Sequence, residues 1–222
     1  MAWTAPRTWT TGELVTAAIM NTHVRDNELF LVARGLYDGF NRADSTTLGN
    51  ANSGHAWTEN AGNQEIVGNA LRGVSNGICT LDSGLELVTM HASGIFTAGS
   101  VAANVDFAIV LRFIDTSNFL YIELTGTLFQ LVKMIAGTPT ALASQAFTPV
   151  ASTTYRIDCW VRGPIVTARL ENAVFVPQTA VYYQTIADTE TPFAGATKTG
   201  LRMFNSGGSG DLCLGFTLMP NA

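Results

Sequence analysis

From about residue 105 onward, the chain alternates between apolar and polar residues with a period of two, which is the pattern of half-buried β-strands. In the predicted strand 105–114, one face is formed by Phe107, Ile109, Leu111 and Phe113. Further short strands are predicted at 119–124, 128–135, 141–147, 155–161, 165–170, 201–204 and 212–218. Turn-forming Gly, Pro, Asn and Asp residues separate most of these segments, and no helical pattern lies between them. The pattern predicts a mainly β fold, an antiparallel sandwich.

The segment 155–161 is the most informative of these strands, because its polar face carries an aromatic residue among charges. Sugar-binding sites combine a flat aromatic face with a few well-placed hydrogen-bonding groups. If 165–170 is the adjoining hairpin strand, Arg169 and Thr167 lie beside that face. The predicted glycan-binding residues are Trp160, Arg156, Asp158, Arg162 and Arg169, with Trp57 in a loop as a second aromatic candidate. The alternatives are a half-buried sandwich residue or a subunit contact for Trp160, and a core residue at the sandwich edge for Trp57.

The first forty residues follow a helical pattern instead. Thr10 and Glu13 have the spacing of a capping box, and Gly35 is placed to end the helix, which predicts a helix over about 11–34. Apolar residues recur along it at three- and four-residue spacing, as in a coiled-coil seam, with one polar Asn that would fix the register. The residues predicted for oligomerisation or docking are Leu14, Ala17, Met20, Val24, Asn27 and Leu31. An ordinary amphipathic helix packed on its own domain is the alternative.

The helical pattern and the β pattern together predict that the chain has two structural parts. Residues 1–38 form an N-terminal attachment or oligomerisation segment with a helix, and residues 39–222 form the β-sandwich. The expected partners are further copies of the same chain, with a trimer as the preferred state, or another protein to which the helix docks.

Composition narrows the classes of function. Only 13% of the residues are charged, whereas soluble domains average about a quarter. The net charge of −5 argues against a nucleic-acid binder, which needs a basic surface. No apolar run approaches the roughly 18–20 residues that span a bilayer, so membrane insertion is not expected. The three cysteines, Cys79, Cys159 and Cys213, form no CxxC pair and are predicted to be reduced and buried.

Catalytic chemistry is not predicted. Glycoside hydrolysis needs two carboxylates facing one another across the substrate. Glu123 stands alone on its strand, Asp158 lies between Arg156 and Trp160, and Asp188 and Glu190 lie in a predicted loop. We therefore expect no enzymatic activity, no catalytic residues and no cofactor.

Neither the histidines nor the possible metal ligands of the chain predict a functional site. His23, His55 and His91 are far apart, and the chain has no nucleophile-elbow motif. Loops with Asp44, Asp115 and Asp211 could supply oxygen ligands to calcium, but they lack EF-hand spacing, so no metal site is predicted.

Two parts of the chain resemble known families. The segments Trp3–Trp9, Thr11–Ala18 and Asn21–Asn27 resemble a leader found on structural proteins of tailed bacteriophages and prophages. The resemblance covers about 30 residues and implies an attachment module on a virion protein, with other virion proteins as partners. It favours a minor tail or short tail-fibre protein in the virion, assembled in the bacterial cytoplasm, and leaves capsid decoration as an alternative.

The rest of the chain is similar to concanavalin A-like (laminin G-like) jelly-roll domains. The segments that carry the similarity are Gly39–Ser45, Ser53–Thr58, Val110–Phe113, Phe119–Leu124, Tyr155–Ile157 and Gly200–Met203. It implies a jelly-roll fold but not one function, since such sandwiches serve as lectins, glycosidases and structural modules. Binding of host-surface glycans during adsorption is the expected role, and a glycan-processing enzyme is the rival.

Overall fold

The computed structural model describes residues 14, 16–21, 35–172, 174, 176–203 and 210–220. The chain divides into two compact units, Met1–Gly35 and Leu36–Ala222. No helix among the described residues is long and apolar enough to cross a membrane.

In the first unit, the described residues form a short helix, α1 (Ala17–Met20). Thr16 is its N-cap, and the Thr16 hydroxyl accepts a hydrogen bond of 3.3 Å from the amide of Ile19. Leu14, Ala17 and Met20 of the predicted seam are exposed. Leu14 is not helical and Thr16 has an extended backbone, so the helix begins at Ala17 and the predicted start at residue 11 is wrong. The other seam residues, Val24, Asn27 and Leu31, and the capping pair Thr10 and Glu13 lie outside the described residues, so the continuation of the helix and its seam stay predictions.

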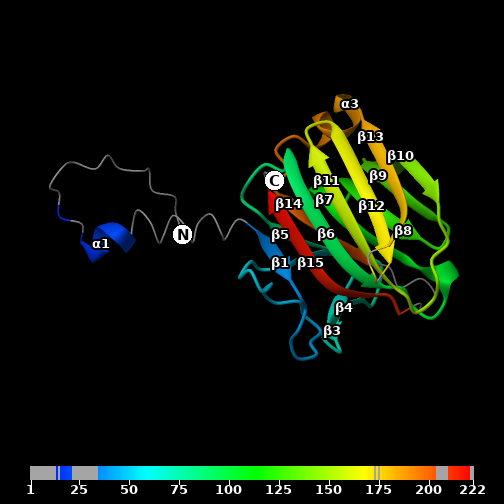
Figure 1. Ribbon diagram of the computed structural model, residues 1–222, viewed down its shortest axis with the longest axis horizontal. Helices are drawn as coiled ribbons and strands as arrows, with labels where there is room; N and C mark the ends of the chain where they lie inside the picture. Colours follow the sequence, from blue (N-terminus) through cyan, green and yellow to red (C-terminus); the bar gives the residue numbers. More distant parts are fainter. Residues whose placement is uncertain are drawn as a thin grey trace. The chain divides into compact units, whose positions relative to one another are not determined.

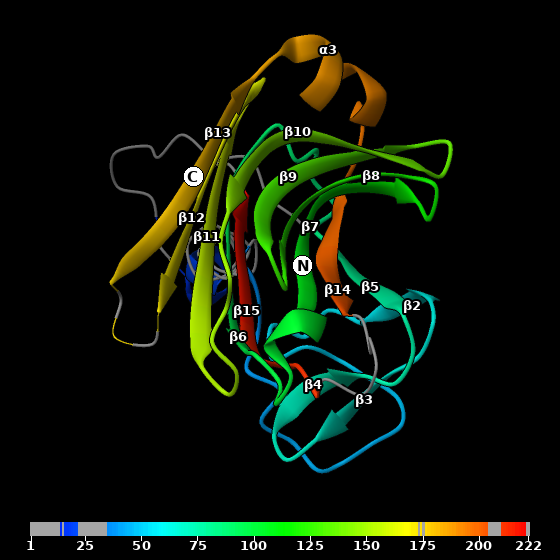
Figure 2. The ribbon, with the colours of Figure 1, turned by 90° about the vertical axis from the view of Figure 1, so that its right-hand side faces the viewer.

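The second unit is a sandwich of two antiparallel sheets (Figures 1 and 2). In the first sheet the strands follow the order β13 (Pro177–Gln184), β12 (Ile165–Asn172), β11 (Thr154–Arg162), β6 (Thr89–Thr97), β15 (Leu212–Pro220), β4 (Ala70–Gly73) and β3 (Gln64–Val67), and β1 (Leu36–Asp38) pairs with β15. The second sheet has the order β10 (Thr138–Ala146), β9 (Leu128–Ile135), β8 (Asn118–Thr125), β7 (Asp106–Asp115), β14 (Lys198–Met203), β5 (Gly77–Asp82) and β2 (Thr58–Ala61). Short helical turns complete the unit: η2 (Ala102–Asn104), α3 (Ile186–Thr189) and η3 (Thr191–Phe193). The predicted jelly-roll sandwich is confirmed.

The β unit begins at Leu36, before the boundary expected at residue 39. The reason is strand β1, which pairs with the last strand, β15, and therefore belongs to the first sheet.

The core lies between the two sheets and is built by the inward residues of each strand. Phe96 of β6 and Phe107 of β7 stack across it, with ring centroids 4.2 Å apart. The inward residues of β11, opposite its predicted polar face, are Tyr155, Ile157, Cys159 and Val161, and all are buried. The three cysteines are free and buried, as expected, and burial raises the pKa of each thiol.

The predicted inward face of 105–114 is right for Phe107, Ile109 and Leu111 and wrong for Phe113. The pairing of β7 with β8 shifts register between Val110 and Arg112, which marks a bulge. Past the bulge, Phe113 lies on the outer face of the second sheet, where it packs in a separate apolar cluster. Its ring centroid is 6.0 Å from that of Phe119.

The same bulge turns Arg112 inward. Its guanidinium is buried and donates to the carbonyl oxygens of Leu87 (2.8 Å), Val88 (3.0 Å) and Gly163 (3.2 Å), and also to that of Thr189. Burial lowers the pKa of Arg112 from its ordinary value. One side chain thus joins the segment before β6, the β11–β12 turn and the end of α3.

Candidate functional site

The outer face of the first sheet brings the predicted polar residues together. In the register of β6, β11 and β12, Asp158 is paired with Ser93 on one side and with Arg169 on the other. Trp160 is paired in the same way with His91 and Thr167. Arg156 and Arg162 lie on the same face of β11, because alternate residues of a strand point to the same side.

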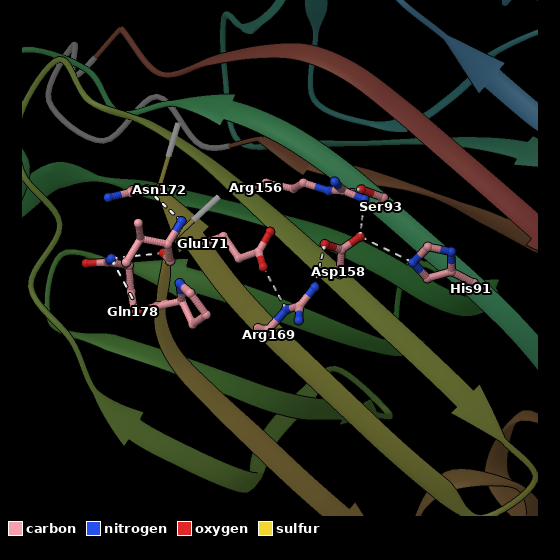
Figure 3. A network of polar contacts seen from close by, with 10 residues as sticks. His91, Ser93, Arg156, Asp158, Arg169, Glu171, Asn172 and Gln178 are labelled. Atoms are coloured by element: carbon pink, nitrogen blue, oxygen red, sulfur yellow. Dashed lines mark hydrogen bonds and ion pairs between the residues drawn. The ribbon is translucent and has the colours of Figure 1, made fainter. Parts of the chain in front are cut away.

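Asp158 is the centre of an ionic network on this face (Figure 3). Its carboxylate is fully buried. Oδ1 accepts a hydrogen bond of 2.9 Å from Arg156 Nη2 and lies 3.2 Å from His91 Nε2, and Oδ2 lies 3.7 Å from Arg169 Nη2. The charge of Asp158 is therefore compensated in place, as a buried carboxylate requires.

The arginines of the network are in turn held by further contacts. Arg156 Nε donates to the Ser93 hydroxyl at 3.1 Å, and Arg169 Nε lies 3.0 Å from Glu171 Oε1. Glu171 is buried, whereas the side chains of Arg156 and Arg169 are 33% and 42% exposed. The carboxylates of Asp158 and Glu171 are thus buried, whereas the guanidinium groups of Arg156 and Arg169 reach the solvent.

Trp160 is half-buried beside this network and has a fixed orientation. Its ring stacks on His91 with centroids 5.0 Å apart and planes 9° apart. The guanidinium carbon of Arg169 lies 5.5 Å from the centroid of the Trp160 ring. Trp160 also borders a hollow of about 360 Å³, together with Arg162, Ile165 and Thr167.

A second hollow lies on the same face. It has a volume of about 290 Å³ and is bordered by Arg156, Ser93, Ile95, Tyr37 and Thr217, among others. Arg156 and Arg162 are six positions apart on one strand, which corresponds to about 20 Å. The two hollows, with the Asp158 network between them, form an elongated surface.

Trp57, the second aromatic candidate, is not part of this surface. It is buried in the core, where its ring stacks on Phe40 with centroids 5.9 Å apart. Its Nε1 donates a hydrogen bond of 2.7 Å to Asp38, a buried carboxylate that also binds Arg42 through two hydrogen bonds. The prediction that Trp57 offers an exposed binding platform is wrong, because Asp38 gives the indole N–H a partner inside the protein.

His91, Ser93 and Glu171 belong to the network but are not among the residues that the sequence predicts for the site. His91 and Ser93 lie on β6, and the Asp158–His91 contact joins residues 67 positions apart. Only the strand order could have revealed them. Glu171 continues the alternation of Thr167 and Arg169 along β12, so that pattern, extended by one step, could have found it.

The carboxylates weighed for catalysis are engaged in other contacts. Glu123 accepts hydrogen bonds from Gln130 Nε2 (2.6 Å) and Arg202 Nη1 (2.9 Å). Arg202 also lies over the ring of Tyr121, whose pKa is raised to about 12 by burial. Glu123 is thus paired rather than isolated, as part of an ion pair on the outer face of the second sheet.

Asp188 lies on α3 instead of in the predicted loop, and Glu190 directly follows that helix. The Asp188 carboxylate is bound by Lys133 and Tyr183. The Lys133 ammonium and the Tyr183 hydroxyl lower the pKa of Asp188. These contacts attach α3 to β9 and β13.

The three aspartates considered for calcium do not come together. Asp44 accepts from the amide of Gly68, Asp115 from that of Ser117, and Asp211 from that of Gly99. Among the described residues, no group of three or more His, Cys, Asp or Glu side chains could hold a metal ion.

Comparison with known proteins places the fold. No protein-family model matches the sequence, and no curated protein matches it. The carbohydrate-binding module CBM66 from Bacillus subtilis superposes with a TM-score of 0.53 at 12% identity, covering 71% of this chain and 91% of that chain. The CBM2 module of the evolved Dit protein from Lactobacillus casei BL23 phage J-1 gives a TM-score of 0.53 at 10% identity, covering 85% and 97%.

A larger protein also contains this fold. The GH43 protein BlXynB from Bacillus licheniformis gives a TM-score of 0.59 at 12% identity, over 83% of this chain and 39% of that chain. This chain therefore spans about two fifths of the length of BlXynB. At these identities the likeness concerns architecture, and it identifies the β unit as a jelly-roll sandwich of the kind found in carbohydrate-binding modules.

Proposed function

We propose that this chain is a non-enzymatic structural protein of a tailed-phage particle, a minor tail or short tail-fibre component whose β unit binds host-surface glycans. The glycan site is the outer face of β11 and β12, around Trp160. The N-terminal segment attaches the protein to the particle or joins its copies.

The resemblance of the first 30 or so residues to a phage leader supports the particle assignment. The jelly-roll fold of the β unit is shared with a module of a phage Dit protein, which is consistent with this role. The engaged carboxylates support a binding function over hydrolysis, because Glu123 is held in an ion pair with Arg202.

One observation carries the glycan site: Trp160 is held in place by His91 and Arg169 and borders an open hollow. A side chain that is already ordered loses little conformational entropy when a ligand binds. Thr167 and Arg162 around the hollow supply hydrogen-bonding groups for sugar hydroxyls. The hollow thus offers a sugar the solvent-facing part of the Trp160 side chain as an apolar contact, with a few polar groups beside it.

The test is a glycan array, followed by titration calorimetry, with the wild type and a Trp160→Ala variant. We expect the substitution to weaken binding about tenfold or more, since aromatic contacts contribute about 0.5–1.5 kcal/mol beyond their buried area. Ile114→Ala is the control, because Ile114 is an exposed apolar side chain on the second sheet. Thermal melts of each variant separate lost binding from lost folding. Binding unchanged by Trp160→Ala would exclude this site.

The location of this protein within the phage particle is tested separately. The measurement is its copy number in purified virions. A handful of copies agrees with a tail or fibre component. Hundreds of copies on the head would assign the protein to capsid decoration instead. Turnover of a polysaccharide by the purified protein would contradict the non-enzymatic role.

A further inference from the structure

The outer face of β11 and β12 presents cations to the solvent. Three of the chain's 12 Lys and Arg residues, Arg156, Arg162 and Arg169, lie on this face. The two carboxylates of the same face, Asp158 and Glu171, are 0% and 5% exposed. A ligand approaching this face therefore meets guanidinium groups, because the side chains of Arg156 and Arg169 are 33% and 42% exposed. Figure 3 shows both arginines beside Asp158 and Glu171.

Arg162 differs from the other two arginines. Arg156 and Arg169 are held by Asp158 and Glu171, whereas no ion pair joins Arg162 to a carboxylate in the part of the chain that the structure describes. Arg162 is the last residue of β11 and is exposed. Its side chain borders the same hollow as Trp160, so its charge is available to a ligand in that hollow.

We infer that the glycan bound at this face is anionic, with a carboxylate or phosphate group held by Arg162. The inference rests on the proposed glycan-binding function and specifies the class of ligand. The guanidinium fork matches the two oxygens of a carboxylate or phosphate, and such charge-assisted hydrogen bonds are about twice as strong as neutral ones. Trp160 and Ile165 contact the apolar side of the sugar ring, and Thr167 offers a hydroxyl to its polar edge.

The acidic net charge of the chain does not oppose this assignment. Charges separated by more than about 8 Å are largely screened at physiological ionic strength. The net charge of −5 is a property of the whole chain, whereas the ligand meets the groups that surround the hollow. Among the described residues, Arg162 is the charged one that borders this hollow, and no Asp or Glu of that part of the chain borders it.

The experiment compares three probes of similar length by titration calorimetry with the full chain. The probes are an oligosaccharide of uronic acids, a phosphorylated glucan and a neutral glucan. We expect at least one anionic probe to bind about tenfold more tightly than the neutral one, and to bind more weakly as salt increases. The two anionic arms distinguish a carboxylate from a phosphate.

The variants Arg162→Gln and Arg162→Lys assign the contact. We expect Arg162→Gln to reduce affinity for the anionic probe about tenfold and to leave affinity for the neutral glucan unchanged. Arg162→Lys should recover part of the loss, because it keeps the charge without the fork. Arg72→Gln is the control, since Arg72 is a partly exposed arginine on β4 that is paired with Glu65 and lies outside this face.

The outcomes separate the two proposals. Equal binding of neutral and anionic probes, or an Arg162→Gln variant that keeps the anionic preference, overturns the inference and leaves the glycan site standing. Binding of no probe, and of no glycan on the array, overturns both.

Discussion

Asp158 is a fully buried carboxylate on the outer face of a sheet, where solvent would be expected. Arg156, Arg169 and His91 cover it and supply its ionic and hydrogen-bonding contacts. Removing Arg156, Arg169 or His91 would leave the buried charge of Asp158 uncompensated. The ionic network therefore holds the neighbouring side chains in place. Trp160 is ordered as a result, since it stacks on His91 and lies close to Arg169.

The sequence reveals this site only in part, and the reason lies at the level of single residues. Alternation along one strand places Arg156, Asp158 and Trp160 on one face, which the structure confirms. Burial of Asp158 could not be predicted, because it depends on His91 from a strand distant in sequence. Trp57 was misjudged for a similar reason, since its hydrogen-bond partner, Asp38, comes from a strand that the pattern did not reveal.

Asp106, a half-buried carboxylate, gives a pH-dependent prediction. Burial raises its pKa to about 7, and the Oδ1 atom is buried without a hydrogen-bond partner among the described residues. A carboxyl whose pKa is higher in the folded state than in the unfolded state favours folding when protonated. Its contribution is complete below about pH 4 and is lost as the pH rises towards 7.

We therefore expect Asp106→Asn to be more stable than the wild type at pH 8, by about 2 kcal/mol after allowance for partial exposure. The difference should shrink as the pH is lowered to 4. Urea denaturation at a series of pH values measures it. Asp44→Asn, at an exposed position, should change stability little, and an identical pH profile for Asp106→Asn and wild type would contradict the prediction.

At the scale of elements, β9 and β11 agree with the predicted strands, whereas β6, with nine residues, and β13, with eight, were not predicted. β9 spans Leu128–Ile135, the predicted segment, and β11 differs by one residue at each end. β2, β3 and β4 were not predicted, because each has four residues and such short runs carry too little periodicity. The bulge in β7 was also missed, since a period of two assumes that no residue is inserted.

That bulge places Arg112 where it joins three separate elements, which gives a second prediction. Arg112→Met removes the donor to the carbonyls of Leu87 and Thr189, and leaves these buried acceptors without it. We expect a loss of about 2–4 kcal/mol in the free energy of unfolding. Chemical denaturation measures it.

Arg72→Met, at a partly exposed ion pair with Glu65, is the control and should cost about 1 kcal/mol. Equal losses for the two variants would show that Arg112 contributes no more than a surface arginine.

At the scale of the whole molecule, the low content of charged residues invites a prediction about assembly. Only 13% of the residues are charged, and the first unit carries the predicted apolar seam. We expect the full chain to form a discrete oligomer, with a trimer preferred, and a chain of residues 36–222 to be a monomer. Light scattering coupled to size exclusion measures both. A stable monomer of the full chain would contradict the role of the seam.

A polar substitution within the seam tests the same prediction without truncation. Met20→Glu changes a residue that is exposed on α1, so it should leave folding of the β unit intact and weaken assembly. Thr217→Glu, on the exposed side of β15, adds the same charge elsewhere and should not change the oligomeric state.

The pairing of β1 with β15 also has a consequence for how the sandwich can be connected to other chains. Leu36 lies opposite Leu218, so the polypeptide enters and leaves the β unit at adjacent points (Figure 1). Paired Cα atoms of antiparallel strands are about 5 Å apart. A domain with neighbouring ends can be inserted into a surface loop of a carrier protein without stretching that loop. The same adjacency makes the unit suitable for circular permutation, with a short linker joining the old ends and new ones opened at an exposed turn such as that between β9 and β10.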